Sequence, residues 1–380
     1  MIVDTAGRVQ HVLVTGGAGF IGSNFVRHLL AARPDVRVVT YDLLTYAGSL
    51  ENLRDLPAPD RHAFVRGDIC DRAAVDAVMR DHAIDTVVHF AAESHVDRSI
   101  TGPAAFIHTN VTGTFTLLEA ARAAWAGRFE DGGVRFHQVS TDEVYGALAA
   151  DRPPVVEGEA YAPRSPYAAS KAAADHLVRA YHVTYGLPVS LSVCSNNYGP
   201  YQFPEKLVPL MIVHGALGKP LPVYGDGLQI RDWLHVEDHC AAILAIVARG
   251  RVGATYHVGG GNQPTNLELV TRLCALLDGR YPAGAPHARL ITYVADRPGH
   301  DRRYDLGFGL IERELGWRPT HGLADGLAAT VAWYADHGAW LAAIRDSDDF
   351  RRWLALNYDA RGEREDPERQ PAIEAPEDRS

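Results

Sequence analysis

The sequence predicts an α/β protein, with a doubly wound parallel sheet and a smaller mixed α/β lobe. Three observations support this prediction. β-rich runs alternate with helical stretches through the first half, a glycine-rich loop follows the first of these runs, and the pattern becomes irregular after residue 199. Such alternation is typical of βαβ units, whose strands run parallel. Because ligands of these sheets bind outside the carboxyl ends of the strands, we expect the chemistry there.

The elements follow from local residue patterns. Short runs of apolar and β-branched residues predict strands at 11–15, 36–42, 62–68, 85–93 and 134–141. Apolar residues at helical spacing predict helices at 21–32, 71–82, 103–125, 205–217, 236–249, 266–277, 307–315 and 322–337. The runs LPVYG and IRDWLHV suggest short strands of the lobe. We expect a Rossmann-type domain over residues 1–190, with some later segments interleaved, and a second lobe mainly over 191–357.

Composition narrows the class of protein. The chain has 380 residues, of which 47% are hydrophobic, and a formal net charge of -10. This charge disfavours partners such as nucleic acid and acidic membranes. No stretch approaches the roughly 20 apolar residues of a membrane span, and the N-terminus does not resemble a signal peptide. The four cysteines form no CxxC pair, which indicates reduced thiols. We therefore expect a cytoplasmic protein.

The C-terminal segment has a different composition. Between Asp359 and Ser380 there are no aromatic residues, eight acidic residues and four arginines. A segment of this composition buries too little apolar surface to offset its conformational entropy. We expect a disordered acidic tail over residues 358–380.

The loop TGGAGFIG at 15–22 follows the first predicted strand and opens a helix. It fits GxGxxG through Gly17, Gly19 and Gly22, and GxxGxxG through Gly16, Gly19 and Gly22. Glycines at this spacing let backbone amides approach a pyrophosphate at a helix N-terminus. Asp42 stands 20 residues after Gly22, the spacing of an acid that binds a cofactor ribose. A carboxylate there disfavours a 2′-phosphate, so the sequence predicts NAD rather than NADP.

The run STDEVYG at 140–146 places two adjacent carboxylates, Asp142 and Glu143, at the end of a predicted strand. Two neighbouring acids in different environments can share one proton and serve as acid and base. The alternative is that they only cap the next segment. In SPYAASK, Tyr167 and Lys171 share one helical face. A nearby ammonium together with a cationic nicotinamide ring would favour the phenolate, and Thr141 could share the substrate's hydrogen bond.

Two further motifs have more ordinary interpretations. HVEDH contains His235, Glu237, Asp238 and His239, but it is not HExxH and no further ligand cluster is evident in the sequence. We therefore expect no metal. The run DRPGHDRRYD is a basic cluster in an acidic chain. A solvated loop is the default interpretation, and diphosphate binding is the alternative, through Arg297, His300, Arg302 and Arg303 together with Arg231.

Several long motifs resemble one known family. The motifs TGGAGFIGS, LTYAGSLENL, AAESHVDRSI, STDEVYG, SPYAASK, NNYGPYQFPEKLVPL, IRDWLHVEDH and VADRPGHDRRYD are similar to those of dTDP-glucose 4,6-dehydratases, in the extended short-chain dehydrogenase/reductase superfamily. The resemblance runs from about residue 10 to residue 357 and excludes the tail. It implies a hydro-lyase that uses NAD and a nucleotide-sugar substrate, dTDP-glucose, and that makes dTDP-4-keto-6-deoxyglucose for deoxysugar biosynthesis.

The resemblance also implies roles for the five candidate catalytic residues. Tyr167 takes the proton of the sugar 4-hydroxyl while C4 is oxidised, with Thr141 and Lys171 in support. Glu143 then removes H5, and Asp142 protonates the departing 6-hydroxyl. Return of the hydride to C6 leaves the cofactor as it began. Alcohol oxidation or epimerisation alone would not need the acid pair.

Binding residues carry over where the motifs match. For the cofactor they are Gly16, Gly19, Phe20, Ile21, Gly22, Asp42, Asp68, Ile69, Ala91, Thr109, Tyr167 and Lys171. For the nucleotide sugar, bound mainly by the second lobe, they are Ser94, His95, Thr141, Asn196, Lys206, Leu207, Arg231, Asn266, Arg297 and His300. Leu43 replaces a lysine of the family, which would loosen cofactor binding without redirecting the reaction. The resemblance further implies a homodimer, formed through helices at 103–125 and 167–185.

Two other functions remain open from the sequence. A nucleotide-sugar 4-epimerase would share the fold, NAD and the Tyr/Lys pair but would release no water, and the acid pair argues against it. A silent NAD-binding sensor or scaffold would have lost catalytic groups, whereas all five are present. The residues do not show whether the substrate carries thymidine or uridine. They also leave open whether the product feeds rhamnose synthesis or a secondary metabolite.

Overall fold

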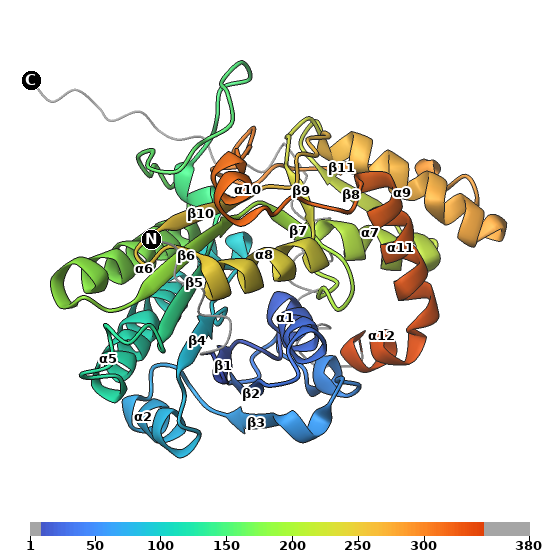
Figure 1. The fold of residues 1–380 in the computed structure, drawn as a ribbon. Coiled ribbons are helices and arrows are strands. Elements are labelled where there is room, and N and C mark those ends of the chain that lie inside the picture. Colours follow the sequence, from blue (N-terminus) through green and yellow to red (C-terminus); the bar gives the residue numbers. More distant parts are fainter. Residues whose placement is uncertain (1–8, 346–380) are drawn as a thin grey trace, which may run out of the picture. The chain divides into compact units, whose positions relative to one another are not determined.

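The computed structural model of the protein describes residues 9–345. The tail predicted over 358–380 lies outside this range. Within it, the chain forms one compact unit that ends at His337, and helix α12 (Gly338–Arg345) belongs to a second unit. Figure 1 labels the elements along the chain.

Seven parallel strands form the main sheet, which confirms the predicted fold class. Their order is β10–β6–β5–β4–β1–β2–β3, and every pairing is parallel. The strands are β1 (His11–Thr15), β2 (Arg37–Asp42), β3 (His62–Arg66), β4 (Thr86–His89), β5 (Arg135–Thr141), β6 (Val189–Cys194) and β10 (Thr255–Val258). The chain order reverses between β1 and β4, the position at which such sheets bind ligands.

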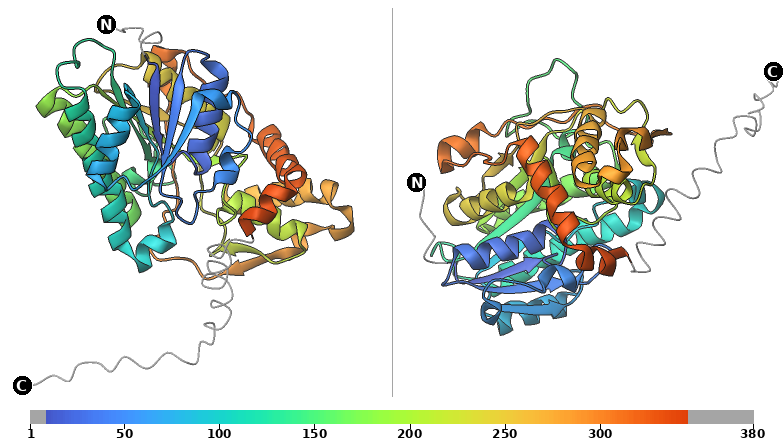
Figure 2. Two further views of the ribbon diagram at one scale, coloured as in Figure 1. Left: turned by 90° about the horizontal axis from the view of Figure 1, so that it is seen from below. Right: turned by 90° about the vertical axis from the view of Figure 1, so that its right-hand side faces the viewer.

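Helices cover both faces of this sheet. One face carries α2 (Arg72–Asp81), α5 (Thr114–Ala124) and α6 (Pro166–Tyr185), and the other carries α1 (Phe20–Ala32) and α8 (Val236–Arg249). The left view of Figure 2 shows the teal and green helices α5 and α6 on one side of the strands and the blue α1 on the other. Alternate residues of β1 point to opposite cores, with Leu13 in the first and Val12 in the second. Burial of both faces explains why the strands are apolar throughout.

Two predicted elements differ from the structure. Strand β4 ends at His89 rather than near residue 93, because Ala91 turns against the glycine loop: a Cβ on Gly16 would lie 2.6 Å from the Ala91 nitrogen. The helix expected over 103–125 consists of α4 (Pro103–Phe106), the π-helical segment η3 (Ile107–Gly113) and α5. A π-helical turn often marks a functional position, and η3 contributes to the cavity described below.

The remaining elements form the lobe. Its helices include α7 (Leu207–Ala216), α9 (Asn266–Arg280), α10 (Gly309–Leu315) and α11 (Leu323–Asp336), close to the predicted ranges, and a short helix α3 (Val96–Thr101) follows β4. Two parallel strand pairs join β8 (Leu221–Tyr224) to β11 (Ile291–Val294) and β7 (Asn196–Tyr198) to β9 (Trp233–His235). The boundary expected at residue 190 stays a prediction. Within residues 9–345, no helix combines the length and apolar character that a bilayer crossing requires.

Candidate active site

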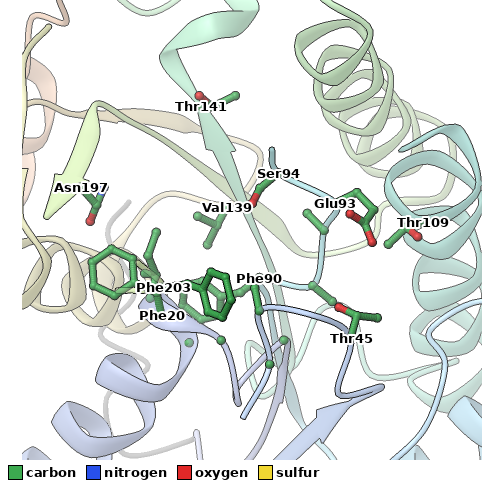
Figure 3. Close-up of a pocket in the computed structure, with 18 of the residues that line it drawn as sticks. Phe20, Thr45, Phe90, Glu93, Ser94, Thr109, Val139, Thr141, Asn197 and Phe203 are labelled. Carbon is green, nitrogen blue, oxygen red and sulfur yellow. The ribbon is translucent and has the colours of Figure 1, made fainter. Parts of the chain in front are cut away.

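A cavity of about 330 Å³ opens at the carboxyl ends of β1, β4 and β5, where the sheet was expected to bind its ligands. In Figure 3, the oxygen atoms of Glu93, Ser94 and Thr141 lie along the cavity, and Phe20 and Phe90 give it an apolar part. All five candidate catalytic residues line this cavity. So do all of the predicted cofactor residues, from the glycine loop to Thr109 on η3.

The glycine turn leaves room only for backbone. Gly16 has a φ of 68°, and a Cβ on Gly22 would lie 2.3 Å from the carbonyl oxygen of Gly16. The lining glycines are those of the GxxGxxG set, since Gly17 packs against Thr40 instead. A Cβ at Gly16 or Gly22 would collide with neighbouring backbone, so glycine permits the tight turn that opens α1, as a dinucleotide-binding loop requires.

Asp42 closes the cofactor end of the cavity. Its carboxylate accepts hydrogen bonds from the backbone nitrogens of Ala18, at 3.0 Å, and Leu44, at 2.8 Å. These bonds fix the carboxylate at the rim, where each oxygen keeps a lone pair for a ribose hydroxyl. Leu43, the departure from the family motif, also lines the cavity and is 42% exposed.

The acid pair lies directly after β5. Thr141 caps the turn Asp142–Tyr145 (η4), because its hydroxyl accepts a hydrogen bond from the backbone nitrogen of Glu143 at 3.3 Å. The capping function therefore belongs to Thr141 and not to the acids. The Thr141 hydroxyl donates to Oδ1 of Asp142 at 3.3 Å, while Oδ2 of this buried carboxyl has no hydrogen-bond partner among the described residues.

The two carboxyl groups lie in different electrostatic environments. Burial raises the pKa of Asp142 well above its usual range, and the charge of Glu143 raises it further. Burial also raises the pKa of Glu143, but the nearby Arg297, Arg231 and Lys206 act in the opposite direction. Asp142 consequently holds a proton more firmly than Glu143. The pair can supply one acid and one base at the same pH.

Tyr167 and Lys171 lie one turn apart at the start of α6. The side chain of Ser165 caps this helix by accepting from the backbone nitrogen of Ala168 at 3.1 Å, and Pro166 occupies the first helical position. The Lys171 ammonium donates to the carbonyl oxygen of Val139 at 2.7 Å, which ties it to β5. The helix thus presents both side chains to the end of the strand that carries the acid pair.

Burial dominates the titration of Tyr167. It raises the pKa of this phenol well above 10, and the charge of Glu143 adds to the effect, whereas a hydrogen bond with Thr141 lowers it. In this environment the ammonium of Lys171 does not by itself favour the phenolate. A further positive charge in the cavity, such as a nicotinamide ring, is needed to bring the pKa down.

The predicted substrate residues divide into two groups. Ser94, Thr141, Asn196 and Lys206 line the cavity. The others do not: His95, Leu207, Arg231, Asn266, Arg297 and His300. Arg231 and Arg297 are nevertheless close enough to lower the pKa of Glu143. Asn266 begins α9, and its buried Oδ1 has no partner among the described residues.

Sequence reasoning missed part of the lining. Glu93, Asn197, Gln202 and Glu205 all face the cavity. Each is a polar residue within AAESHVDRSI or NNYGPYQFPEKLVPL, two of the motifs that resemble the family. Their polarity within these motifs was the signal that could have identified them. Glu205 is only 6% exposed: its Oε1 accepts a hydrogen bond from Tyr46, and its Oε2 lies 3.8 Å from Nε2 of His95. These polar side chains make this part of the cavity wall suited to a polar ligand.

The motif HVEDH acquires a new neighbour in the structure. His235 and Glu237 lie near His321, and one potential ligand atom of each falls within 4.8 Å of the others. However, the rings of His235 and His321 stack at 4.1 Å with 25° between their planes. Stacked rings direct their lone pairs side by side rather than toward one point, which is poor geometry for a single ion. The expectation that this motif holds no metal stays a prediction.

Comparisons with known proteins agree with this arrangement. A family model described as GDP-mannose 4,6 dehydratase matches residues 13–330. A dTDP-glucose 4,6-dehydratase of Salmonella typhimurium is 51% identical over 360 residues, which cover 92% of this chain and 99% of the relative. The enzyme of the same name from Xanthomonas campestris is 54% identical over 338 residues, covering 88% and 95% of the two chains.

Solved structures are also more similar to this chain when they are dehydratases than when they are epimerases. A dTDP-glucose 4,6-dehydratase from Streptomyces venezuelae, crystallised with NAD bound, matches with a TM-score of 0.80 and 50% identity, covering 88% of this chain and all of that one. A UDP-glucose 4-epimerase of Thermus thermophilus, in complex with NAD, reaches a TM-score of 0.76 but only 30% identity, covering 86% and 100%. Both enzymes share the fold of this chain, whereas its sequence identity is higher to the dehydratase. This chain belongs to the dTDP-glucose 4,6-dehydratase family.

Proposed function

We propose that the chain is a hydro-lyase that converts dTDP-glucose to dTDP-4-keto-6-deoxyglucose, with NAD as its cofactor. The observation that carries this proposal is the acid pair at the end of β5, whose two carboxyl groups face one cavity with different affinities for a proton. Elimination of water needs an acid and a base near neighbouring carbons at the same pH. Relatives that are at least 50% identical carry the name of this activity.

The acid is Asp142 and the base is Glu143. Burial raises the pKa of Asp142 well above its usual range, so this carboxyl can hold a proton and deliver it to the departing 6-hydroxyl. Burial raises the pKa of Glu143, but Arg297, Arg231 and Lys206 oppose this shift, so Glu143 gives up its proton more readily than Asp142 and can remove H5. Oxidation of C4 must come first, because a ketone at C4 acidifies the hydrogen on C5.

Tyr167 is the base for the 4-hydroxyl, and Lys171 is its support. The hydrogen bond between Tyr167 and Thr141 would direct both side chains at the same sugar hydroxyl. Once bound, NAD would supply the hydride chemistry at C4 and C6. Gly16, Gly22 and Asp42 would hold its pyrophosphate and ribose.

Behind Lys171, a buried carboxylate balances its charge. Asp175 lies one turn further along α6 and is fully buried. It accepts hydrogen bonds from the Ser140 hydroxyl, at 2.5 Å, and from the Tyr161 hydroxyl, at 3.0 Å. Burial lowers the pKa of Lys171, and the charge of Asp175 raises it. Asp175 thus joins α6 to the end of β5 and helps keep the ammonium charged.

A homodimer is the proposed assembly. Four large apolar side chains are exposed on η3, α5 and α6: Ile107 at 51%, Phe115 at 45%, Val183 at 83% and Tyr185 at 48%. Helices α5 and α6 pack against each other. Exposed large apolar side chains on helices that pack side by side support an interface between chains here. A charged substrate and a charged cofactor further support a location in the cytoplasm.

The proposal is tested by incubating the full chain with dTDP-glucose and analysing the product by mass spectrometry. Loss of one water is expected. An unchanged mass with inversion at C4 would identify a 4-epimerase, and bound NAD without turnover of any hexose nucleotide would identify a sensor. Reaction with UDP-glucose instead of dTDP-glucose would keep the mechanism and correct the nucleotide.

A further inference from the structure

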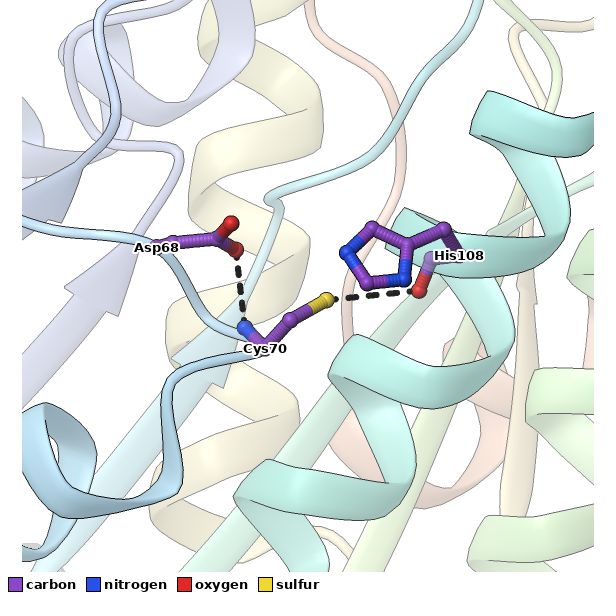
Figure 4. A group of neighbouring side chains, drawn as sticks. All are labelled: Asp68, Cys70 and His108. Atoms are coloured by element: carbon purple, nitrogen blue, oxygen red, sulfur yellow. Dashed lines mark hydrogen bonds between the residues drawn. The ribbon is translucent and has the colours of Figure 1, made fainter.

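Three potential metal ligands meet beside the cofactor end of the cavity. Asp68 and Cys70 follow β3, and His108 belongs to the π-helical segment η3. One oxygen, sulfur or nitrogen atom of each side chain lies within 4.8 Å of the other two. Figure 4 shows the Cys70 thiol between the carboxylate of Asp68 and the imidazole of His108. Segments 38 residues apart therefore bring a mixed O, S and N donor set together.

The two segments are held close by contacts that do not use all of these donor atoms. Oδ1 of Asp68 accepts a hydrogen bond from the backbone nitrogen of Cys70 at 2.8 Å. The Cys70 thiol donates to the carbonyl oxygen of His108 at 3.4 Å. A Cβ on Gly113 would lie 2.4 Å from the end of the Ile69 side chain and 3.4 Å from the Cys70 sulfur, so a larger residue there would displace Ile69 from η3. These contacts keep η3 close to the segment that carries Asp68 and Cys70.

The cluster is also accessible. Cys70 is half-buried and His108 is exposed, whereas the other three cysteines of the chain are buried. Asp68 lines the cavity, so an ion bound here would lie at the edge of the cofactor pocket. An incoming ion can reach this thiol without any rearrangement of the core.

The donor set determines the kind of ion. Thiolate and imidazole select zinc and related thiophilic ions over magnesium or calcium. Zinc bonds of roughly 2.0–2.3 Å in a tetrahedron place ligand atoms roughly 3.5 Å apart, so the side chains need to move by about 1 Å. Burial and the charge of Asp68 raise the pKa of the Cys70 thiol to about 12, and a bound cation would replace that proton.

We propose that Asp68, Cys70 and His108 bind a divalent thiophilic ion of the zinc class, and that this ion competes with the cofactor. Competition follows because coordination engages Asp68, which lines the cavity and which the family resemblance assigns to NAD, the cofactor of the proposed function. The site thus makes the enzyme sensitive to such ions without giving it a catalytic metal. The ion-binding part stands on geometry alone, and only the competition rests on the proposed function.

Co²⁺ is the probe for the ion-binding part, since a thiolate bound to Co²⁺ gives a charge-transfer absorbance in the near ultraviolet. Titration of the full chain with Co²⁺ should produce this absorbance, and Zn²⁺ should abolish it. Cys70→Ser should lose it, His108→Gln should weaken binding at least about tenfold, and the matched control Cys274→Ser should retain it. No absorbance in the unaltered chain, or its persistence in Cys70→Ser, would overturn the site.

NAD affinity tests the competition without any reference to dehydration. Added Zn²⁺ should raise the apparent Kd for NAD of the unaltered chain and leave that of Cys70→Ser unchanged. If Co²⁺ binds through Cys70 but Zn²⁺ does not change the apparent Kd for NAD, the competition is wrong. Because neither measurement requires turnover, their failure is distinct from failure of the proposed function.

Discussion

The cofactor side and the sugar side of the cavity are built by different means. On the cofactor side, backbone geometry dominates: Gly16 and Gly22 leave no space for a side chain, and Asp42 is fixed by two backbone nitrogens. On the sugar side, charged side chains from separate segments surround Glu143, among them Arg231 and Arg297. The first side depends on shape and the second on charge. Substitutions should therefore act on cofactor affinity in one case and on rate or pH dependence in the other.

The largest effect is expected on the sugar side, at the proposed base. Glu143→Gln should lower kcat by about 10²–10⁴-fold, the usual contribution of a general base, while NAD stays bound. Steady-state kinetics with dTDP-glucose and the absorbance of bound cofactor measure the two quantities. Glu130→Gln, an exposed acid, is the matched control. A Glu143→Gln variant that dehydrates at the normal rate would show that Glu143 is not the base.

On the cofactor side, Gly22→Ala should weaken NAD binding while sparing the acid pair. The new Cβ would lie 2.3 Å from the carbonyl oxygen of Gly16, so the turn has to shift. We expect at least about a tenfold loss of affinity, since a strained backbone costs roughly 1–3 kcal/mol. Isothermal titration with NAD measures it. Gly133→Ala, which meets no atom within 4 Å, should bind NAD normally; equal affinities would contradict a backbone-built pocket.

The same contrast explains what the sequence could predict. The glycine loop and its strand form one continuous segment, and local spacing was enough to place Gly16, Gly22 and Asp42 at the cavity. The β10 edge strand and the division of 103–125 around η3 depend on tertiary packing, so no local pattern predicted them.

On the sugar side, the family resemblance named substrate residues whose positions in the fold could not be predicted from their spacing in the sequence. Arg231, Asn266, Arg297 and His300 come from the lobe, and none of them lines the cavity of this structure. The different affinities of Asp142 and Glu143 for a proton arise from burial and from Arg231 and Arg297, which are far from Glu143 in sequence. The sequence alone shows neither how deeply a carboxyl group is buried nor which charges lie near it.

Arg297 gives a smaller and more specific test of charge on the sugar side. Its Nη1 donates to Asp97 at 3.2 Å, and its charge lowers the pKa of Glu143. Arg297→Ala should raise the pKa of Glu143, so the base is protonated at higher pH and the acid limb of the rate profile moves upward.

The family resemblance assigns Arg297 to the nucleotide sugar, so the KM of Arg297→Ala should also rise, by about tenfold, since a hydrogen bond to a charged group contributes roughly 1.5–3 kcal/mol. Arg302→Ala is the control, because this side chain is exposed and pairs with Asp226. Rate profiles that coincide for the two variants would show that Arg297 does not influence the base.

The smallest effect is expected at Asp175, which lies behind Lys171 and outside the cavity lining. Asp175→Asn removes a charge that raises the pKa of Lys171, so the ammonium is lost at lower pH and the alkaline limb moves downward. At neutral pH the loss of rate should stay below about tenfold, because Asp175 contacts neither ligand. The pH profile of kcat, with the melting temperature as a check on folding, measures this. An unchanged alkaline limb would reduce Asp175 to a structural role.

The acid–base division between Asp142 and Glu143 is the central claim, and hydrogen exchange at C5 tests it most directly. Each variant is incubated with dTDP-glucose in D₂O, and deuterium at C5 is measured in the product and in the recovered sugar nucleotide. The unaltered chain should give a dehydrated product with deuterium at C5. Asp142→Asn should still exchange C5 while losing dehydration, and Glu143→Gln should lose both. Exchange that survives in Glu143→Gln but disappears in Asp142→Asn would reverse the assignment.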